Sequence, residues 1–217
     1  MSAASKYSGS YNDITRFISY FEQIRLVTST GGRKILEVGV GNKTVSTYLK
    51  NNGYDCTTCD IDAALEPDVT ADVRALPLPP GSFDTVLACE VLEHIPLSSV
   101  PDALAGIFRV SRRYAVISIP YSNDYIELII KAPVLKIFNR EHMFDFKISL
   151  PHFWKRAVIH SEHCWEPGRK GTSIRSFKKL LKDYFHIISQ TRPPLQMRQI
   201  FFMLEKKTSN SPCGECT

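Results

Sequence analysis

The sequence predicts an α/β fold built on one mostly parallel sheet, and two observations carry this prediction. Short apolar runs rich in β-branched residues alternate with stretches of helical period, which is the pattern of a parallel sheet covered by helices on both faces. The chain has 217 residues, of which 43% are hydrophobic and 23% are charged. This size and composition suit one globular domain with its own core and are too small for two full domains.

The first 120 residues predict helices and strands in alternation. Apolar side chains at helical spacing, among them Ile14, Phe17 and Phe21, predict an N-terminal helix over residues 12–28. The elements predicted after it are a strand at 34–39, a helix at 44–50, strands at 54–59 and 83–89, a helix at 101–109 and a strand at 113–119.

The pattern changes after Pro120. Residues 121–171 are rich in His, Trp and Phe and lack a clean period, so we expect a lid inserted after the fifth strand. A helix resumes at 173–181, and strands at 185–191 and 199–205 are expected to form a terminal antiparallel hairpin. We divide the single domain, residues 1–207, into a helical cap (1–30), a cofactor-binding core (31–120), a lid (121–171) and the last helix with the hairpin (172–207), followed by a disordered tail (208–217).

The sequence has no sign of a targeting or membrane-spanning segment. The N-terminus lacks a basic stretch followed by an apolar run, so no secretory signal is predicted. The longest apolar stretch, residues 125–138, is interrupted by charged residues and proline and is too short to cross a bilayer. We therefore expect a cytoplasmic protein.

The six cysteines predict reduced thiols and no metal site. Cys56 and Cys59 lie three apart in a predicted strand, so their side chains point to opposite faces. Cys213 and Cys216 have a better spacing, but they sit in a polar tail without a second pair. A zinc site from residues 160, 163 and 164 would lack a fourth ligand.

Carboxylates and glycines follow the predicted strands at the edge where open α/β sheets bind their ligands. Dinucleotides need a G-x-G-x-x-G loop with few anions nearby, but the third glycine is missing here, and clustered carboxylates repel phosphates. S-adenosylmethionine carries a sulfonium and an ammonium group and no phosphate, so the charge pattern favours it. The strand-end residues are Glu37, Gly39, Gly41, Asp60, Asp62, Asp72, Cys89 and Glu90.

Four segments in this order and spacing resemble the class I S-adenosylmethionine-dependent methyltransferases, most closely the small-molecule branch. The segments are Ile35-Leu-Glu-Val-Gly-Val-Gly41, Asp60, the stretch 72–84, and Thr85-Val-Leu-Ala-Cys-Glu-Val-Leu-Glu-His-Ile95. The resemblance covers residues 33 to about 120 and, in outline, 172–207. It implies the Rossmann-like methyltransferase fold, with a seven-stranded sheet that ends in an antiparallel hairpin.

The resemblance also implies cofactor roles for the strand-end residues. Glu37 with the backbone of Gly39 and Gly41 would hold the amino-acid end, Asp60 the ribose hydroxyls, Asp72 with the Val73 amide the adenine edge, and Cys89, Glu90 and Val91 the methionine arm. Asp62 competes with Asp60 for the ribose, because strand register is not fixed to one residue by sequence. Many members have glycine where Lys43 stands, which implies a tighter loop or a lysine side chain across the site.

The acceptor side is expected in the N-terminal helix and in the segment after the fifth strand, which begins at Tyr121. The insertion holds four of the six histidines and both tryptophans, and we take His163, His152 and Tyr121 as candidate acceptor-side catalytic residues. The segment His163-Cys-Trp-Glu-Pro-Gly is similar to a stretch in methyltransferases found with surface-polysaccharide biosynthesis. The alternative for these histidines is that they pack within the lid or cap its elements. His94 is expected to pack or cap near its own loop.

Charge is unevenly distributed along the chain. Residues 131–182 contain twelve Lys or Arg and four acids, a net charge of +8, so the remainder of the +5 chain carries −3. A basic lid suggests a small acceptor bearing phosphate or carboxylate, a nucleic acid, or an anionic membrane surface. No nucleic-acid recognition module is evident, whereas residues 126–138, apolar with lysines, suit a membrane surface. A solvated basic face is the alternative.

We therefore expect a methyltransferase that uses S-adenosylmethionine and a small-molecule acceptor. Methyl transfer depends mainly on holding donor and acceptor in line, so no catalytic residue is diagnostic, and a base is needed only for an acceptor that loses a proton. Two alternatives stay open. One is a non-catalytic cofactor-binding module that uses its lid for a partner, and the other is a nucleotide-dependent oxidoreductase.

Overall fold

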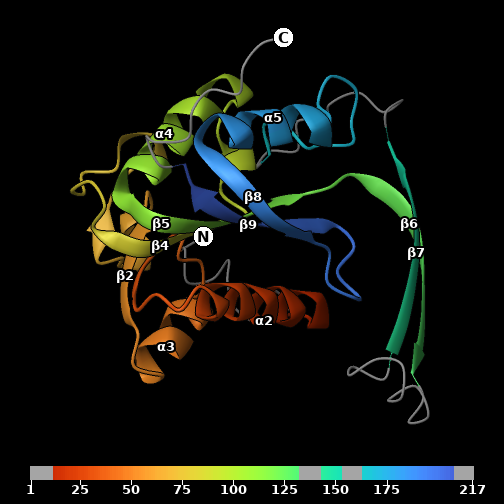
Figure 1. Cartoon of the computed structure of the whole chain (residues 1–217), viewed down its shortest axis with the longest axis horizontal. Helices are drawn as coiled ribbons and strands as arrows, with labels where there is room; N and C mark the ends of the chain where they lie inside the picture. The colour runs from red at the N-terminus through yellow and green to blue at the C-terminus, as the bar shows by residue number, and fades with distance from the viewer. Residues whose placement is uncertain (1–11, 132–142, 153–162, 208–217) are drawn as a thin grey trace.

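A seven-stranded sheet forms the centre of the molecule (Figure 1), with the strand order β3-β2-β1-β4-β5-β9-β8. The computed structural model describes residues 12–131, 143–152 and 163–207. The strands of the sheet are β1 (Lys34–Val38), β2 (Asp55–Asp60), β3 (Val69–Thr70), β4 (Phe83–Cys89), β5 (Ser111–Pro120), β8 (Phe185–Thr191) and β9 (Gln199–Lys206). The first five pair in parallel, and β9 pairs antiparallel with both β5 and β8. The predicted fold class is confirmed.

Helices cover both faces of this sheet. Figure 1 shows α2 and α3 on one side and α4 and α5 on the other. The helices are α2 (Ile14–Ser29), α3 (Thr44–Asn51), α4 (Val100–Val110) and α5 (Ile174–Tyr184). Two separate groups of buried apolar side chains fill the two interfaces, one including Leu104 of α4 and Phe177 of α5, the other including Val27 of α2 and Leu49 of α3. A parallel sheet buried on both faces explains why its strands read as continuous apolar runs.

Local sequence signals fix several boundaries. Ser173 begins α5 with a capping box, in which its side chain accepts from the Ser176 amide and the Ser176 side chain accepts in return. Asp13 caps α2 by accepting from the Arg16 amide at 2.8 Å. Helix α4 has Pro101 in its first turn, where a missing amide hydrogen costs nothing.

The face that α2 buries differs from the one expected from its apolar residues. Ile14, Phe17 and Phe21 are 69%, 57% and 65% exposed. The helix instead turns Tyr20 and Val27 inward, together with polar side chains from the same turns. The physical reason is that this face of α2 borders the ligand cavity described below, which needs polar groups.

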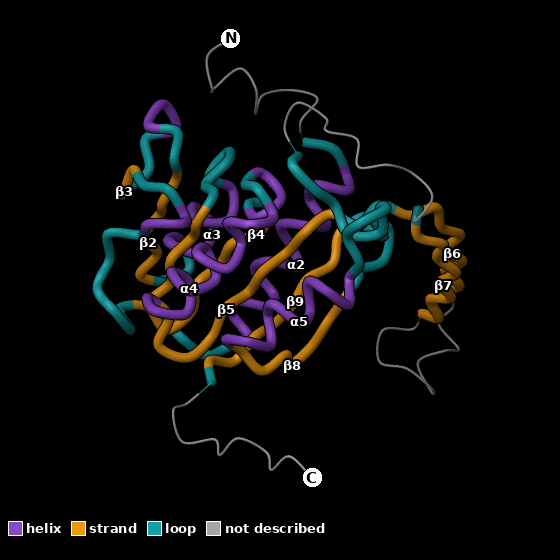
Figure 2. Tube along the Cα trace, turned by 90° about the horizontal axis from the view of Figure 1, so that it is seen from above, coloured by secondary structure: helices purple, strands orange, loops and turns teal. Residues whose placement is uncertain are grey.

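The region after β5 also differs from the expected lid without regular structure. It contains an antiparallel pair of strands, β6 (Asn123–Lys131) and β7 (Met143–Pro151), which form a separate two-stranded sheet. Figure 2 shows this pair at the opposite end of the molecule from β3. A period-two alternation was present in the sequence, because apolar residues at 144, 146, 148 and 150 alternate with Asp145, Lys147 and Ser149.

This β6–β7 pair turns its polar face toward the rest of the protein. Lys147 forms ion pairs with Glu127 and Asp145, and its Nζ donates to the Arg192 carbonyl at 2.8 Å. The Leu195 amide donates to Glu127 at 2.9 Å. The opposite face carries seven large apolar side chains that are about half exposed or more: Ile126, Leu128, Ile130, Phe144, Phe146, Ile148 and Leu150.

The structure settles two smaller expectations. No helix in the described residues is long and apolar enough to cross a membrane. Cys56 and Cys59 are both buried free thiols and belong to the apolar groups on opposite faces of the sheet, as predicted. Cys213, Cys216 and the rest of the expected tail lie outside the described residues.

Candidate functional site

A cavity of about 590 Å³ opens at the carboxyl ends of β1, β2 and β4. All nine residues predicted for the cofactor line it: Glu37, Gly39, Gly41, Asp60, Asp62, Asp72, Val73, Cys89 and Glu90. Carboxyl ends of parallel strands are where open α/β sheets bind their ligands. The residues that the sequence pattern grouped therefore meet at one site, which they reach from the ends of four strands, β1 to β4.

The loop after β1 forms one wall of the cavity. Gly39 has φ 83°, and a Cβ added there would lie 2.4 Å from Cγ2 of Val91, so only glycine fits between these two loops. Lys43, at the end of the same loop, also has a positive φ of 63°. Its side chain does not cross the cavity, because Nζ donates to the Glu66 carbonyl at 3.1 Å.

Asp60, at the end of β2, ties two loops together. One carboxylate oxygen accepts the Val40 amide at 2.8 Å, and the other accepts the Asp62 amide at 2.9 Å. Each oxygen keeps a lone pair for a ligand hydroxyl. Asp62 accepts the Ala64 amide at 2.9 Å and caps the short helix η2 (Ala63–Leu65), so both acids hold backbone as well as lining the cavity.

The third strand ends at a capped turn. Asp72 accepts the Arg74 amide at 2.8 Å and also forms an ion pair with the Arg74 guanidinium. That hydrogen-bonded guanidinium lowers the pKa of Asp72. The carboxylate therefore stays ionised, and the turn places Val73, which is buried, at the cavity wall.

Glu37 is a buried carboxyl at the end of β1. Burial is the main reason why its pKa rises to about 7, and hydrogen bonds from the Ser46 side chain and backbone offset only part of that rise. One of its oxygens, Oε2, has no hydrogen-bond partner. A ligand cation beside Oε2 would pair with this carboxyl group. Because folding has already removed the carboxyl group from water, the pairing adds little desolvation cost.

Glu37 predicts a pH dependence of the ligand-free protein. The folded pKa of about 7 lies above the ordinary 4.5, so the folded state binds more protons between these values and stability falls as the pH rises through them. The effect amounts to roughly 3 kcal/mol. Glu37→Gln should therefore stabilise the protein at pH 8 much more than at pH 4.5, as measured by denaturant unfolding.

Asp84 supplies a control of opposite sign. Hydrogen bonds from the Lys34 and Arg33 amides, with the nearby Arg112, lower the pKa of Asp84. Its contribution is present above the ordinary pKa and is lost as the pH falls, so Asp84→Asn should destabilise more at pH 8 than at pH 3.5. If the free energy of unfolding of the Glu37 and Asp84 variants changed with pH in the same direction, the raised pKa of Glu37 would be contradicted.

The end of β4 brings two further buried groups to the cavity. Glu90 has φ 55°, and Ser118 Oγ donates to its carboxylate at 2.9 Å. Burial raises the pKa of Glu90 and of the neighbouring Cys89 thiol. Backbone strain at a non-glycine residue beside a cavity is typical of functional sites.

Several residues that line the cavity were not predicted from the sequence. Arg16, Tyr20 and Gln23 reach it from α2, and Glu93 and His94 reach it from η4 (Leu92–His94). Glu93 is 0% exposed, although glutamate is a residue type that is usually exposed. The cue that could have identified it is its place three residues after Glu90, directly after a buried strand.

The three candidate acceptor-side residues are not brought together. His163 lines the cavity, whereas His152 and Tyr121 do not. The His152 ring contacts Ser122 Oγ at 3.0 Å and the Asp124 carboxylate at 2.8 Å. The Arg192 guanidinium lies over the Tyr121 ring, 4.2 Å from its centroid. These contacts hold His152 and Tyr121 near the start of the β6–β7 pair, outside the cavity lining.

Acidic side chains outnumber basic ones around the cavity. Six carboxylates line it, against two guanidinium groups, Arg16 and Arg74. None of the described basic residues from 131–182 lines it. The excess of basic residues in the insertion therefore does not face the cavity in the part of the chain that the structure describes.

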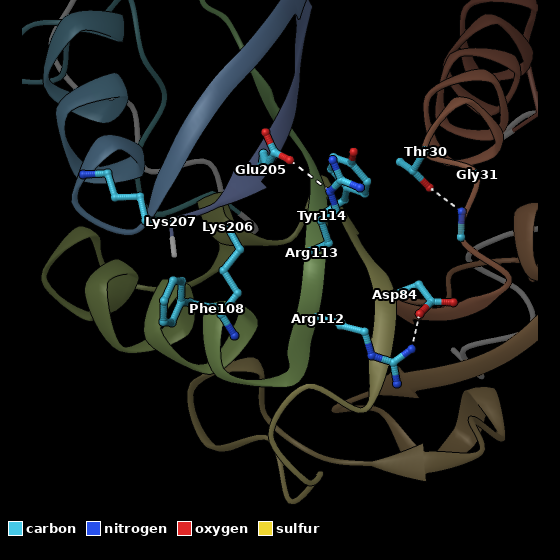
Figure 3. A pocket seen from close by; sticks show the side chains of 11 residues that line it. Thr30, Gly31, Asp84, Phe108, Arg112, Arg113, Tyr114, Glu205, Lys206 and Lys207 are labelled. Atoms are coloured by element: carbon cyan, nitrogen blue, oxygen red, sulfur yellow. Dashed lines mark hydrogen bonds and ion pairs between the residues drawn. The ribbon is translucent and has the colours of Figure 1, made fainter. Parts of the chain in front are cut away.

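A second, larger hollow of about 850 Å³ lies at the other edge of the sheet (Figure 3), where β1, β4 and β5 begin. Three of its four cationic side chains are already engaged: Arg112 pairs with Asp84, and Arg113 Nε lies 3.0 Å from Glu205. Lys206 Nζ donates to the Ser111 carbonyl at 2.8 Å. This hollow lies at the amino ends of the parallel strands, away from the ligand edge of the sheet.

Comparisons with known proteins agree with this location. Residues 36–119 match the family described as Methyltransferase domain. The chain is 31% identical over 100 residues to the Ubiquinone biosynthesis O-methyltransferase of Bordetella parapertussis, a match that covers 39% of this chain and 42% of that relative. The chain thus matches less than half the length of this curated relative.

Solved methyltransferase structures share the whole fold. The N-methyltransferase NodS from Bradyrhizobium japonicum, in complex with S-adenosylhomocysteine, has a TM-score of 0.59 at 10% identity and covers 95% of this chain and 97% of its own. Magnesium protoporphyrin IX methyltransferase from Synechocystis, with bound S-adenosylmethionine, has a TM-score of 0.57 at 13% identity, with 93% and 88% covered. The core of this chain, residues 36–119, is therefore a class I S-adenosylmethionine-dependent methyltransferase domain.

Proposed function

We propose that the protein transfers a methyl group from S-adenosylmethionine to a small-molecule acceptor. The observation that carries this proposal is the cavity lined by six carboxylates and only two guanidinium groups at the carboxyl edge of the sheet. Such a site suits a ligand with two cationic groups and opposes a pyrophosphate. It therefore argues against the nucleotide-dependent oxidoreductase.

The residues of the cavity fit this cofactor. Gly39 has no Cβ, so the cofactor can approach its backbone closely. Oε2 of Glu37, which has no hydrogen-bond partner among the described residues, accepts the ammonium group. Asp60 keeps lone pairs for the ribose hydroxyls, and Asp72 with the Val73 amide reads the adenine edge. When bound, the cofactor supplies an activated methyl group.

The acceptor is proposed to be small. The relatives' names include a ubiquinone biosynthesis O-methyltransferase and a 1,6-didemethyltoxoflavin-N1-methyltransferase, both of which act on ring compounds. An anionic acceptor has less support than the sequence charge suggested, because Arg16 and Arg74 are the only Lys or Arg residues in the described lining, against six acidic side chains. Neutral ring compounds with hydroxyl or amino groups are therefore the first to test.

The test is methyl transfer from S-adenosylmethionine with a labelled methyl group to a panel of phenols, catechols, amino sugars and hydroxy acids. Methylation of one class supports the proposal. S-adenosylhomocysteine binding without transfer to any member would favour the non-catalytic module. Binding of NAD in place of S-adenosylhomocysteine would favour the oxidoreductase.

Among the histidines, His163 is the one we propose for the acceptor side. With the acceptor that the panel identifies, His163→Ala should lower turnover at least about tenfold, because a base or ligand at the acceptor is worth that much or more. His152→Ala, a buried histidine outside the cavity, is the matched variant and should lower stability instead. Unchanged turnover in His163→Ala would remove His163 from the acceptor site.

A further inference from the structure

Three side chains with metal-ligating atoms meet at the wall of the cavity. Glu93 and His94 come from η4, and His163 reaches them from the segment that follows the β6–β7 pair. One ligand atom from each lies within 4.8 Å of the others. The rings of His94 and His163 meet edge to face, with centroids 4.9 Å apart. We propose that Glu93, His94 and His163 bind a divalent transition-metal ion beside the cofactor.

Glu93 is the observation that first requires a cation. It is 0% exposed, and neither of its carboxylate oxygens has a hydrogen-bond partner among the residues that the structure describes. A buried polar group with no partner is rare in folded proteins and points to an ion or a ligand that completes it.

His163 is oriented as a metal ligand. Its Nδ1 lies 2.9 Å from Glu166 Oε1, and Arg169 Nε donates to the other oxygen of Glu166 at 2.9 Å. Glu166 is thus held between Arg169 and His163, and its oxygen accepts the Nδ1 hydrogen because a carboxylate has no hydrogen to donate. That contact directs the Nε2 lone pair to an ion, as in the carboxylate–histidine–metal arrangement.

Backbone hydrogen bonds hold the two halves of the cluster together. The Cys164 amide donates to the Glu93 carbonyl at 2.7 Å. The Trp165 indole donates to the Leu92 and Ile95 carbonyls, each at 3.1 Å. His163 and η4 are thus fixed to each other by neighbouring residues, which is what a preorganised ligand site requires.

The ligand types select a class of ion. Two imidazoles and one carboxylate suit Zn²⁺, Fe²⁺ or Co²⁺, whereas Mg²⁺ and Ca²⁺ prefer oxygen ligands only. Ligands of a tetrahedral ion lie roughly 3.4 Å apart, so binding would draw the most distant of these atoms inward. Three protein ligands leave at least one coordination position for another molecule.

The open position gives the ion a role in the proposed function, on which this part of the inference rests. All three ligands line the cavity that also holds the proposed cofactor residues. A metal ion there would bind an oxygen of the acceptor and lower the pKa of a hydroxyl group. The acceptor class that fits is a phenol or a catechol.

The test is a Co²⁺ titration of the full chain after treatment with EDTA, followed by visible absorption and repeated by calorimetry with Zn²⁺. Cys213 and Cys216 are replaced with serine throughout, because their C-x-x-C spacing can bind these ions. The variants are Glu93→Gln, His163→Ala and Glu166→Gln. His186→Ala, an exposed histidine on β8, is the matched control.

We expect one Co²⁺ per chain with d–d bands. Glu93→Gln and His163→Ala should each weaken binding at least about tenfold, Glu166→Gln by about tenfold, and His186→Ala not at all. Absence of binding, or equal binding by all variants, overturns the inference. Circular dichroism and the thermal midpoint separate lost ligands from lost folding, and His94→Ala provides a second ligand variant.

Failure of the metal site and failure of the proposed function are distinguishable. S-adenosylhomocysteine should bind the EDTA-treated protein, because the proposed cofactor residues do not include the three ligands. Cofactor binding without Co²⁺ binding would remove the metal site and leave the methyltransferase proposal. Co²⁺ binding without cofactor binding would do the reverse.

Discussion

Gly39→Ala is expected to abolish most cofactor affinity. The new Cβ would lie 2.4 Å from Val91 Cγ2, and the backbone has φ 83°, a conformation that costs an alanine about 1–2 kcal/mol. Valine is stiff at χ1, so the clash moves the loop or Val91 into the cavity. We expect S-adenosylhomocysteine affinity to fall at least about tenfold, measured by calorimetry, which corresponds to roughly 1.4 kcal/mol.

Two variants separate the clash from the backbone strain. Gly31 has a similar φ of 73° with nothing within 4 Å of an added Cβ, so Gly31→Ala should lose stability but keep cofactor affinity. Adding Val91→Ala to Gly39→Ala should restore part of the affinity by removing the methyl group that clashes. Equal affinities for Gly39→Ala and the wild type would show that this loop does not contact the ligand.

Asp60→Ala should weaken S-adenosylhomocysteine binding about 10- to 100-fold. Hydrogen bonds to a carboxylate contribute about 1.5–3 kcal/mol each, and the same side chain positions the Val40 amide of the glycine loop. The affinity of Asp60→Asn should lie between those of the wild type and Asp60→Ala, because asparagine keeps one acceptor oxygen. The measurement is a titration of each folded variant, with the thermal midpoint as a check.

Asp62→Ala is the matched control for Asp60. Both acids line the cavity, and both accept backbone amides. If Asp60 holds the ribose, Asp62→Ala should cost stability through the lost cap of η2 and change affinity much less. The opposite ranking would assign the ribose to Asp62.

The fold was predictable where strands are buried on both faces. The limits of β4 were predicted to the residue, because a continuous apolar run between turn residues has one reading in a parallel sheet. The limits of β8 were also predicted, although it is an antiparallel edge strand with alternating burial. The β6–β7 pair was missed although residues 144–150 alternate. Its polar face meets the 192–195 loop through Glu127 and Lys147, so the usual expectation of apolar residues facing the core does not hold there.

The site was predictable only in its strand-end half. Residues after strands must lie at one edge, so Glu37, Asp60 and Asp72 could be grouped without coordinates. Which side chains of α2 and η4 face the cavity depends on how each helix is rotated about its own axis. The exposed Phe17 shows that hydrophobic pattern alone does not fix which face of α2 is buried, and the buried Glu93 shows that residue type alone does not fix exposure in η4.

A calorimetric titration of the full chain with S-adenosylhomocysteine, and in parallel with NAD, tests the central claim most directly. The acidic cavity at the carboxyl edge of the sheet predicts one bound S-adenosylhomocysteine per chain and no measurable NAD binding. Tight NAD binding with no S-adenosylhomocysteine binding would contradict it.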